Sequence, residues 1–536
     1  MKQNKSAEHF IQLPTFDGLV PAELSADYIL PDTYPDVKKI LRVMARPAII
    51  GRYISGRRLE YSGAVDYSIL FSADGENGDS LHCVHFAGEW ENSLGELDSL
   101  DSANISLTPH ISSCSARLSN PRKISIRSTV MTDVKVAANM SCTPKCEGAR
   151  TLEEELRLER LLETVTAKRE RTFVAEPLRI SENLEPDASQ PAIDEVVACN
   201  VNIHFYEAKP LREESGFTVS LKGEAIADCI YKSQTEAGDY RSFSRKLPIS
   251  YIVGADDYTE FFSSCPAETL SAYAAAVPIE INAVASENSY GERRVLELDF
   301  ASDVTVHIIG GEEVPLTLDA YSIERESECI TSELDCEAPS KILWANFSIG
   351  EAVPREELKI PENASVIDAA AEVTANALAL ERGRAVLAGN AAISCILTDA
   401  NGNISVTDVM LPIRCELNAG EIKEPFAYNC TLSASDMRVR FDPERICFDF
   451  EVSLCAEMYE KSRRSVVDTI RLTGDAPSKH NNASLMLCYP AKDESMWQVA
   501  KRYGTTVSAL EAANTAGSRV LLIPSAMPHG FVMEAL

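Results

Sequence analysis

Basic residues are scarce in this sequence compared with acidic ones. The chain has 51 lysines and arginines against 81 aspartates and glutamates, a formal net charge of −30 at pH 7. A surface this acidic repels nucleic acid and anionic lipid headgroups. We therefore expect no nucleic-acid partner. The excess of carboxylates favours solubility or a basic protein partner.

Long hydrophobic runs are also missing. No apolar stretch reaches the roughly 18 residues that suggest a membrane-spanning helix. The first nine residues contain no apolar core of the kind found in signal peptides. We expect a chain that has no membrane span and stays in the cytoplasm where it is made.

Signatures of catalysis and of metal binding are absent from the sequence. Gly310-Gly311 is not followed by the Lys-Ser/Thr pair of a phosphate-binding loop, and no Gly-x-Ser-x-Gly motif occurs. The most metal-like cluster is His82-Cys83-Val84-His85. On a strand, however, His82 would point away from Cys83 and His85. We expect a protein that is not an enzyme and holds neither a metal nor a cofactor; a hydrolase with an active site inside the repeats is the rival reading.

The 15 cysteines do not form a recognisable framework of disulfides or zinc ligands. Their number is odd, and most occur singly inside apolar runs, as Cys229, Cys395 and Cys455 do. The only close pair, Cys142 and Cys146, lacks the second pair that a zinc site needs. We expect reduced, buried thiols that pack as small hydrophobic side chains.

The main positive feature of the sequence is a unit that occurs three times. Each copy has an apolar segment, a glycine and then an alternating strand, and the three glycines are Gly63, Gly223 and Gly389. Their spacing is the size of a domain. In each copy a turn rich in Asp, Asn or Gly and a return strand follow, which predicts a hairpin. A later pair of alternating strands predicts a sheet with one packed face and one solvated face.

A short helix is predicted before each glycine strand, because the apolar residues there are spaced by three to four. The three candidates are residues 35–43, 191–197 and 365–373. The charged segments 151–171 and 459–470 are predicted as edge strands or short helices that join the units. The expected fold is therefore mainly β, with three sandwich-like repeats that each carry a short helix.

The C-terminal region reads as strand, helix, turn, helix, strand. Asp493 or Ser495 can cap the first helix, Gly504 suits its left-handed stop, and Thr506 can cap the second helix. A small βααβ domain is expected here. The predicted divisions are three repeats at residues 1–150, 151–320 and 321–473, a linker at 474–484, the βααβ domain at 485–526 and a tail at 527–536.

The C-terminal domain resembles a LysM module. The matching residues are Asp493, Ser495-Met496-Trp497, Val499-Ala500, Arg502-Tyr503-Gly504, Leu510, Asn514 and Leu522-Ile523-Pro524. LysM modules bind N-acetylglucosamine glycans, and some bind proteins. The resemblance implies a partner- or glycan-binding surface, for which the candidate residues are Asp493, Met496, Trp497, Tyr503 and Asn514. For Trp497, a place in the core between helix and sheet is an equally good reading.

The repeats resemble the SPOCS domain of spore-forming Firmicutes. The resemblance is carried by Pro31, Pro35-Asp36 and Ile40-Leu41 in the first copy, Leu178-Arg179-Ile180 and residues 192–196 in the second, and residues 358–362 and 366–368 in the third. Several such repeats followed by one LysM module are the arrangement of a family of spore-coat morphogenetic proteins. The resemblance implies a scaffold in the mother-cell cytoplasm, at the forespore surface, that binds the coat ATPase SpoIVA and other coat proteins.

Two other readings of the C-terminal domain stand beside this one. Residues 495–514 also have the rhythm of a helix-turn-helix, but the region from Leu485 to Leu536 has as many acidic as basic residues. DNA binding needs a basic surface, so this reading is disfavoured. The other alternative is a module that binds N-acetylglucosamine glycan and anchors the chain to cortex peptidoglycan.

Overall fold

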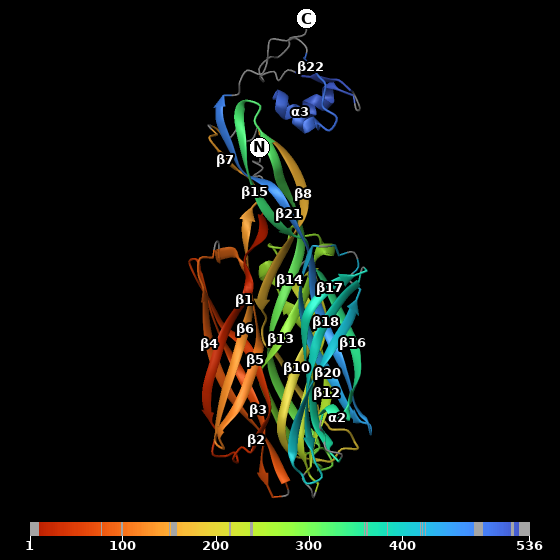
Figure 1. The fold of residues 1–536 in the computed structure, drawn as a ribbon. Helices are drawn as coiled ribbons and strands as arrows, with labels where there is room; N and C mark the ends of the chain where they lie inside the picture. Colours follow the sequence, from red (N-terminus) through yellow and green to blue (C-terminus); the bar gives the residue numbers. More distant parts are fainter. Residues whose placement is uncertain are drawn as a thin grey trace.

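The structure is a computed structural model, and it is mainly β. It describes residues 10–76, 78–97, 100–149, 151, 158–213, 216–235, 239–358, 360, 363–382, 384–418, 420, 422–423, 425–475, 486–515 and 519–524. The linker expected at 474–484 lies outside the described residues from position 476 on, and so does the tail expected at 527–536. Three long blocks of strands stand side by side, and a narrower stalk carries the C-terminal domain (Figure 1).

Two three-stranded antiparallel sheets form block 1. The first sheet has the order β1-β6-β5, with β1 at Phe10–Ile29, β6 at Lys123–Ser141 and β5 at Asn104–Asn120. The second has the order β2-β3-β4, with β2 at Lys39–Ser55, β3 at Arg58–Gly75 and β4 at Gly78–Leu94. A 3₁₀ turn, η1, spans Leu100–Ser102. Alternate residues of β3 and β6, such as Val65 and Val130, are fully buried between the sheets, which makes the block a sandwich.

Block 2 has the same plan. In its first sheet β14 (Val295–Tyr321) pairs with β9 (Leu178–Leu184) and with β13 (Ser271–Ser286). Its second sheet has the order β10-β11-β12, with β10 at Ile193–Glu213, β11 at Gly216–Ser233 and β12 at Tyr240–Gly254. Two 3₁₀ turns, η2 at Asp256–Tyr258 and η3 at Ala267–Thr269, join the sheets. The buried core of this block includes Phe217, Tyr231 and Phe262.

Block 3 repeats the plan again. Its first sheet has β21 (Arg445–Asp475) between β16 (Lys341–Pro354) and β20 (Phe426–Phe441). Its second sheet has the order β17-β18-β19, with β17 at Ser365–Glu381, β18 at Arg384–Thr398 and β19 at Ile404–Leu417. A four-residue helix, α2, spans Arg355–Leu358. The predicted hairpins around Gly63, Gly223 and Gly389 are the pairs β3–β4, β11–β12 and β18–β19.

The repeated glycine has the same physical role in all three blocks. In each, the strand that precedes the glycine strand has a β-bulge where it pairs with the glycine. A Cβ atom on Gly223 would lie 2.4 Å from the carbonyl oxygen of His204, and one on Gly389 would lie 2.2 Å from that of Thr374. On Gly63 it would lie 2.6 Å from the carbonyl oxygen of Ala48. Only glycine permits this close backbone approach.

The three predicted helices are wrong. Residues 39–43 begin β2, residues 193–197 begin β10, and residues 365–373 lie in β17. Leu41, Val197 and Ile367 are each the extra residue of a second bulge, one that shifts the alternation of the strand by one position. That shift puts apolar residues three to four apart, which imitates a helical spacing. The pairing of each strand with the glycine strand along nearly its whole length outweighs the local pattern.

The stalk is built from strands that continue beyond the blocks. β14 extends to Tyr321 and pairs there with β8 (Glu159–Val174), and β21 extends to Asp475 and pairs with β15 (Arg325–Glu337). The short strand β7 (Lys145–Glu147) runs parallel to the end of β21. Of the charged segments that the sequence predicts as joining elements, residues 159–171 and 459–470 are therefore strand.

The C-terminal domain has the element order expected from the sequence. Strand β22 (Met486–Cys488) pairs with β23 (Leu521–Ile523), and helices α3 (Met496–Tyr503) and α4 (Val507–Ala513) lie between them in the chain. Ser495 caps α3 in a capping box with Gln498, and Gly504 ends the helix at φ 66°. Thr506 caps α4 by accepting from the backbone N–H of Ala509.

Candidate functional site

The C-terminal domain rests on the stalk through Trp497. The indole Nε1–H donates to Asp319 Oδ2 at 2.8 Å, and the ring packs edge-on against Tyr321 with centroids 4.9 Å apart. Lys501 Nζ lies 2.6 Å from Asp319 Oδ1. The buried Tyr321 hydroxyl donates to the carbonyl of Thr505 at 2.7 Å. Trp497 is thus an anchor between the domain and the end of β14.

The carboxylate of Asp319 joins the two contacts of this anchor. Partial burial pushes the pKa of Asp319 upward, but the hydrogen bonds from Lys501 and Trp497 outweigh it and leave the pKa below its usual value. Asp319 and Tyr321 lie far from the domain in the sequence, and no local motif marks them. Sequence reasoning therefore missed both residues.

Asn514 ties the two ends of the domain together. Its Nδ2 donates to the carbonyls of Leu510 and Leu522, at 2.8 Å each, and its Oδ1 accepts from the backbone N–H of Leu522 at 2.7 Å. These three bonds fix the end of α4 against β23. In this arrangement the Asn514 side chain satisfies backbone groups within the domain.

The other three predicted residues differ in exposure. Met496 and Tyr503 are half-buried and pack against the apolar core of the domain, as Trp497 does. Asp493 is exposed in the turn before α3. The structure therefore brings Met496, Trp497 and Tyr503 to one core and leaves Asp493 at the surface. Leu487 and Tyr489, which are 52% and 75% exposed, accompany Asp493 among the accessible residues of the domain.

A second site, which sequence reasoning missed, lies where the three blocks meet near the base of the stalk. Lys168 on β8 is buried, and its Nζ lies 2.6 Å from Glu457 Oε1 on β21 and 2.9 Å from Glu170 Oε2. Glu457 also accepts from the Ser340 hydroxyl at 2.6 Å and from Asn429 Nδ2 at 2.6 Å. We call these residues, with His307 and Tyr273, the junction network.

His307 and Tyr273 extend the junction network across block 2. His307 Nδ1 lies 3.2 Å from Glu170 Oε1, and its ring stacks on Tyr273 with centroids 4.3 Å apart. The Tyr273 hydroxyl donates to Glu457 Oε2 at 3.2 Å. From block 1, Lys135 Nζ donates to Asn429 Oδ1. All three blocks therefore meet through directional polar contacts.

The buried charges of the junction network stabilise one another. Burial disfavours the charged form of Lys168, but Glu170 and Glu457 offset this and hold its pKa well above the usual value. Burial would raise the pKa of Glu457, whereas the Lys168 ammonium lowers it below its ordinary value. Buried charges are tolerated only when paired and hydrogen-bonded in this way. The alternation of the strands gives no signal for this burial, because Lys168 and Glu457 lie on the faces opposite to the apolar residues Ala167 and Ala456.

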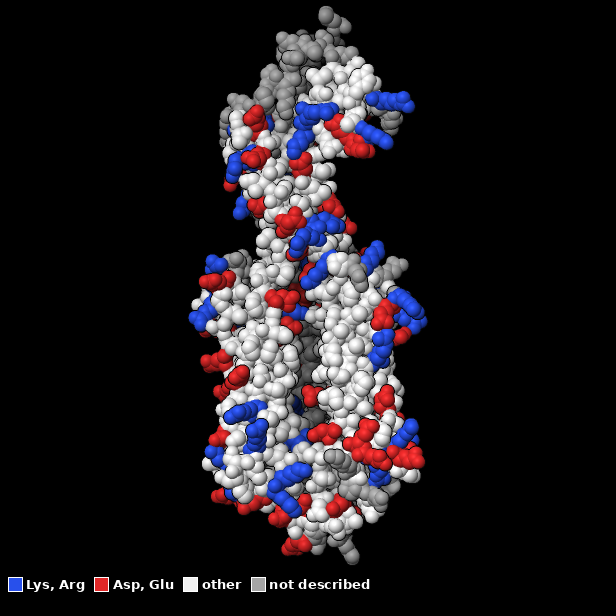
Figure 2. Space-filling view, viewed as in Figure 1, with Lys and Arg blue, Asp and Glu red and all other residues white. Residues whose placement is uncertain are grey.

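A cavity of about 480 Å³ adjoins this network, and Lys168, Glu170 and Glu457 are among the residues that line it. Block 1 lines it with β1, β5 and β6, block 3 lines it with β17, β20 and β21, and Tyr273, Ala275 and His307 of block 2 form a third wall. Figure 2 shows a lengthwise hollow between the two front blocks, with acidic and basic side chains along it. We call this cavity the junction groove.

The described residues contain no group of three His, Cys, Asp or Glu side chains that could hold a metal ion. In the segment His82–His85, from which the sequence predicts no metal site, Cys83 Sγ and His85 Nε2 are 3.9 Å apart, while His82 stacks on Phe71. All 15 cysteines are free thiols. Within the described ranges, every helix is too short or too polar to cross a bilayer.

The chain has no counterpart in three comparisons with known proteins. No protein-family model matches it, and neither a curated protein nor a solved structure does.

Proposed function

We propose that the chain is a non-enzymatic assembly scaffold, a spore-coat morphogenetic protein of the SipL type. In this proposal it acts in the mother cell at the forespore surface and docks the coat ATPase SpoIVA through its LysM-like C-terminal domain. The three blocks are three copies of a SPOCS-like unit that form the platform. The proposal rests on the resemblance of the repeats and of the C-terminal motif to those two families.

The observation that best supports a docking role is the position of the C-terminal domain. It lies at the far end of the stalk, away from the blocks (Figure 1), and Trp497, Lys501 and Thr505 hold it to β14. A domain held in this way presents its remaining surface to a partner at little entropic cost. Since Trp497 contacts the stalk, the partner-facing surface is the one around Asp493 and Tyr489.

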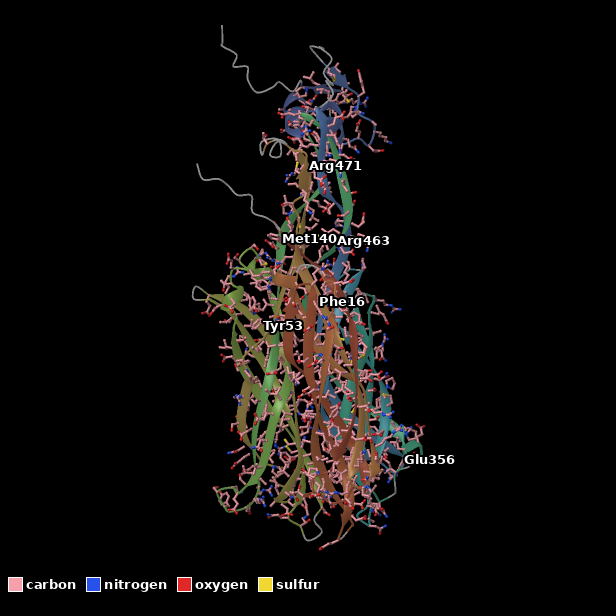
Figure 3. All side chains as sticks on the ribbon, turned by 90° about the vertical axis from the view of Figure 1, so that its left-hand side faces the viewer. Phe16, Tyr53, Met140, Glu356, Arg463 and Arg471 are labelled. Carbon is pink, nitrogen blue, oxygen red and sulfur yellow. The ribbon has the colours of Figure 1, made fainter. Side chains whose placement is uncertain are left out.

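The test measures the affinity of the purified full chain for purified SpoIVA. The variant Asp493→Lys reverses an exposed charge on the proposed surface. The matched control, Glu356→Lys, reverses an exposed charge on α2, near the end of the blocks opposite the stalk (Figure 3). We expect Asp493→Lys to weaken binding about tenfold, which corresponds to about 1.4 kcal/mol, and Glu356→Lys to leave it unchanged.

Equal affinities for wild type and both variants would overturn docking through this surface. Titration with chito-oligosaccharides distinguishes the glycan alternative. Saturable glycan binding that Asp493→Lys abolishes, together with no affinity for SpoIVA, would replace the scaffold proposal by glycan anchoring.

A further inference from the structure

The junction groove has the dimensions of a small-molecule site. Its volume of about 480 Å³ falls in the range that ligand pockets occupy, roughly 300–1,000 Å³. Its walls come from all three blocks, so the groove exists only in the assembled chain. This feature is independent of the C-terminal domain and of the function proposed for it.

The charge of the lining is strongly acidic. The carboxylates of Asp17, Asp133, Glu170, Glu337 and Glu457 line the groove together with only two lysines, Lys135 and Lys168. Lys168 is already paired with Glu170 and Glu457, and Lys135 donates to Asn429. An anionic ligand would find both ammonium groups engaged. A cation would be attracted by the lining and by the negative charge of the whole chain.

Two of these carboxylates are half-buried and have only loose ion pairs: Lys135 Nζ lies 3.9 Å from Asp133, and Lys461 Nζ lies 3.6 Å from Glu337. Both distances are longer than the 2.6 Å at which Lys168 pairs with Glu457. Burial raises the pKa of both carboxyl groups. A bound cation would offset this cost of burial. Asp133 lies on the block 1 wall and Glu337 at the end of β15, so they approach a ligand from different sides.

Aromatic rings complete the lining, and one of them already holds an ammonium group. Phe16, Tyr273, Tyr428 and Tyr459 line the groove. The Lys168 ammonium lies 4.3 Å from the centroid of the Tyr459 ring while it pairs with two carboxylates. Carboxylates and aromatic faces together are the surroundings that alkylammonium groups prefer. The Lys168 side chain therefore shows that the lining of this groove can hold a primary ammonium group between carboxylates and an aromatic ring.

We propose that the junction groove binds a primary alkylammonium group, with Asp133 and Glu337 pairing with the ammonium and the aromatic rings covering its alkyl chain. A free polyamine and a lysine side chain of another protein share this chemistry. A metal ion fits less well, because no group of described residues provides three converging ligands. An ammonium ion needs only separate hydrogen-bond acceptors.

Isothermal titration calorimetry of the full chain at physiological salt tests the proposal. Spermidine probes a free polyamine, Nα-acetyl-lysine methylamide probes a lysine side chain, and a neutral diol controls for polarity. At this ionic strength the Debye length is about 8 Å, so weak attraction to the acidic surface is largely screened. We expect one saturable site per chain for an amine and none for the diol. The tighter amine identifies the source.

Matched variants locate the site. Asp133→Asn and Glu337→Gln each remove one groove charge and leave the junction network intact. Glu356→Gln removes an exposed charge on α2. We expect each groove variant to weaken amine binding about tenfold, equal to about 1.4 kcal/mol, and the control to bind as wild type does. Circular dichroism and the melting temperature establish that the variants remain folded.

Three results would overturn the proposal. One is the absence of saturable heat with either amine. Another is unchanged affinity in both folded groove variants. The third is an equal loss of affinity in Glu356→Gln, which would mean that the amine binds to the acidic surface in general.

Discussion

The three blocks meet in two places that differ in chemistry. Near the hairpin turns the contact is apolar and involves equivalent positions: Leu70 on β3, Ile230 on β11 and Ile396 on β18 share one cluster. At the base of the stalk the contact is the junction network, to which each block contributes different side chains. Apolar contacts are non-directional, so three similar residues can fill one space. Hydrogen bonds and ion pairs are directional and specify a single arrangement.

The difference suggests a division of roles. The apolar junction supplies free energy of association between the blocks, because its residues are almost completely removed from water. The junction network fixes how the blocks are rotated against one another, and it leaves a groove that an apolar contact would fill. At the apolar junction a few polar contacts assist, such as the ion pair between Arg42 and Asp368 at 2.5 Å.

The largest expected effect comes from breaking the junction network at Lys168. The variant Lys168→Met leaves Glu170 and Glu457 buried without their cation. We expect the free energy of unfolding to fall by about 4 kcal/mol, the cost of an uncompensated buried charge. Urea denaturation at neutral pH measures it. The control Lys209→Met, which removes the exposed pair with Glu207, should cost less than about 1 kcal/mol. Equal effects would mean that the network contributes no more than a surface pair.

A smaller effect is expected at the apolar junction. Ile396→Ala removes a fully buried side chain, and we expect a loss of about 3 kcal/mol in the free energy of unfolding. Leu70→Ala and Ile230→Ala occupy the equivalent positions and should cost similar amounts. The exposed Ile252 provides the control, because Ile252→Ala should change stability by less than about 0.5 kcal/mol. Unequal costs across the three positions would show that the blocks do not contribute equivalently.

The smallest effect concerns a charge close to the apolar junction. Burial raises the pKa of Asp228 from 3.8 to about 6. Between these pH values the folded state binds more protons than the unfolded state, so the free energy of unfolding falls as the pH rises. Asp228→Asn removes this loss. The whole change in pKa would give roughly 3 kcal/mol at pH 7, but Asp228 is only partly buried and solvent screens its charge. We therefore expect the variant to be more stable than wild type by about 2 kcal/mol at pH 7, with the difference vanishing below the unfolded pKa.

Thermal or urea unfolding across this pH range measures the effect of Asp228. Glu297→Gln, at an exposed position of β14, serves as the control and should keep the wild-type pH profile. A difference between Asp228→Asn and wild type that did not depend on pH would assign the effect to packing instead of to the charge.

Features of the fold with a local cause could be predicted from the sequence. The recurrence of Gly63, Gly223 and Gly389 marked the central strands, because a bulge in the neighbouring strand permits no Cβ there. Ser495, Gly504 and Thr506 marked the helix ends, because capping depends on residues within one turn. The three helices were predicted wrongly because bulges imitate their spacing.

Features that depend on distant contacts could not be predicted. No residue near Trp497 in the sequence indicates that its indole N–H donates a hydrogen bond to Asp319. The charged segment that contains Lys168 was predicted as a joining element. Its buried position could not be predicted, because the partner that stabilises it, Glu457, lies in another block. Such contacts follow from how β8, β14 and β21 leave the blocks and meet in the stalk. The sequence pattern of each strand specifies which face is buried, but not which other strand covers that face.

The most direct test of the account uses the three tryptophans of the chain, Trp90 in block 1, Trp344 in block 3 and Trp497 in the C-terminal domain. Variants that keep one tryptophan and replace the others by phenylalanine report unfolding around that tryptophan by fluorescence. Trp344 also packs against the core of block 2, so it reports blocks 2 and 3 together. If the two junctions hold the blocks as one body, Trp90 and Trp344 will report the same urea midpoint. Separate midpoints for Trp90 and Trp344 would show that the blocks unfold independently and would contradict the account.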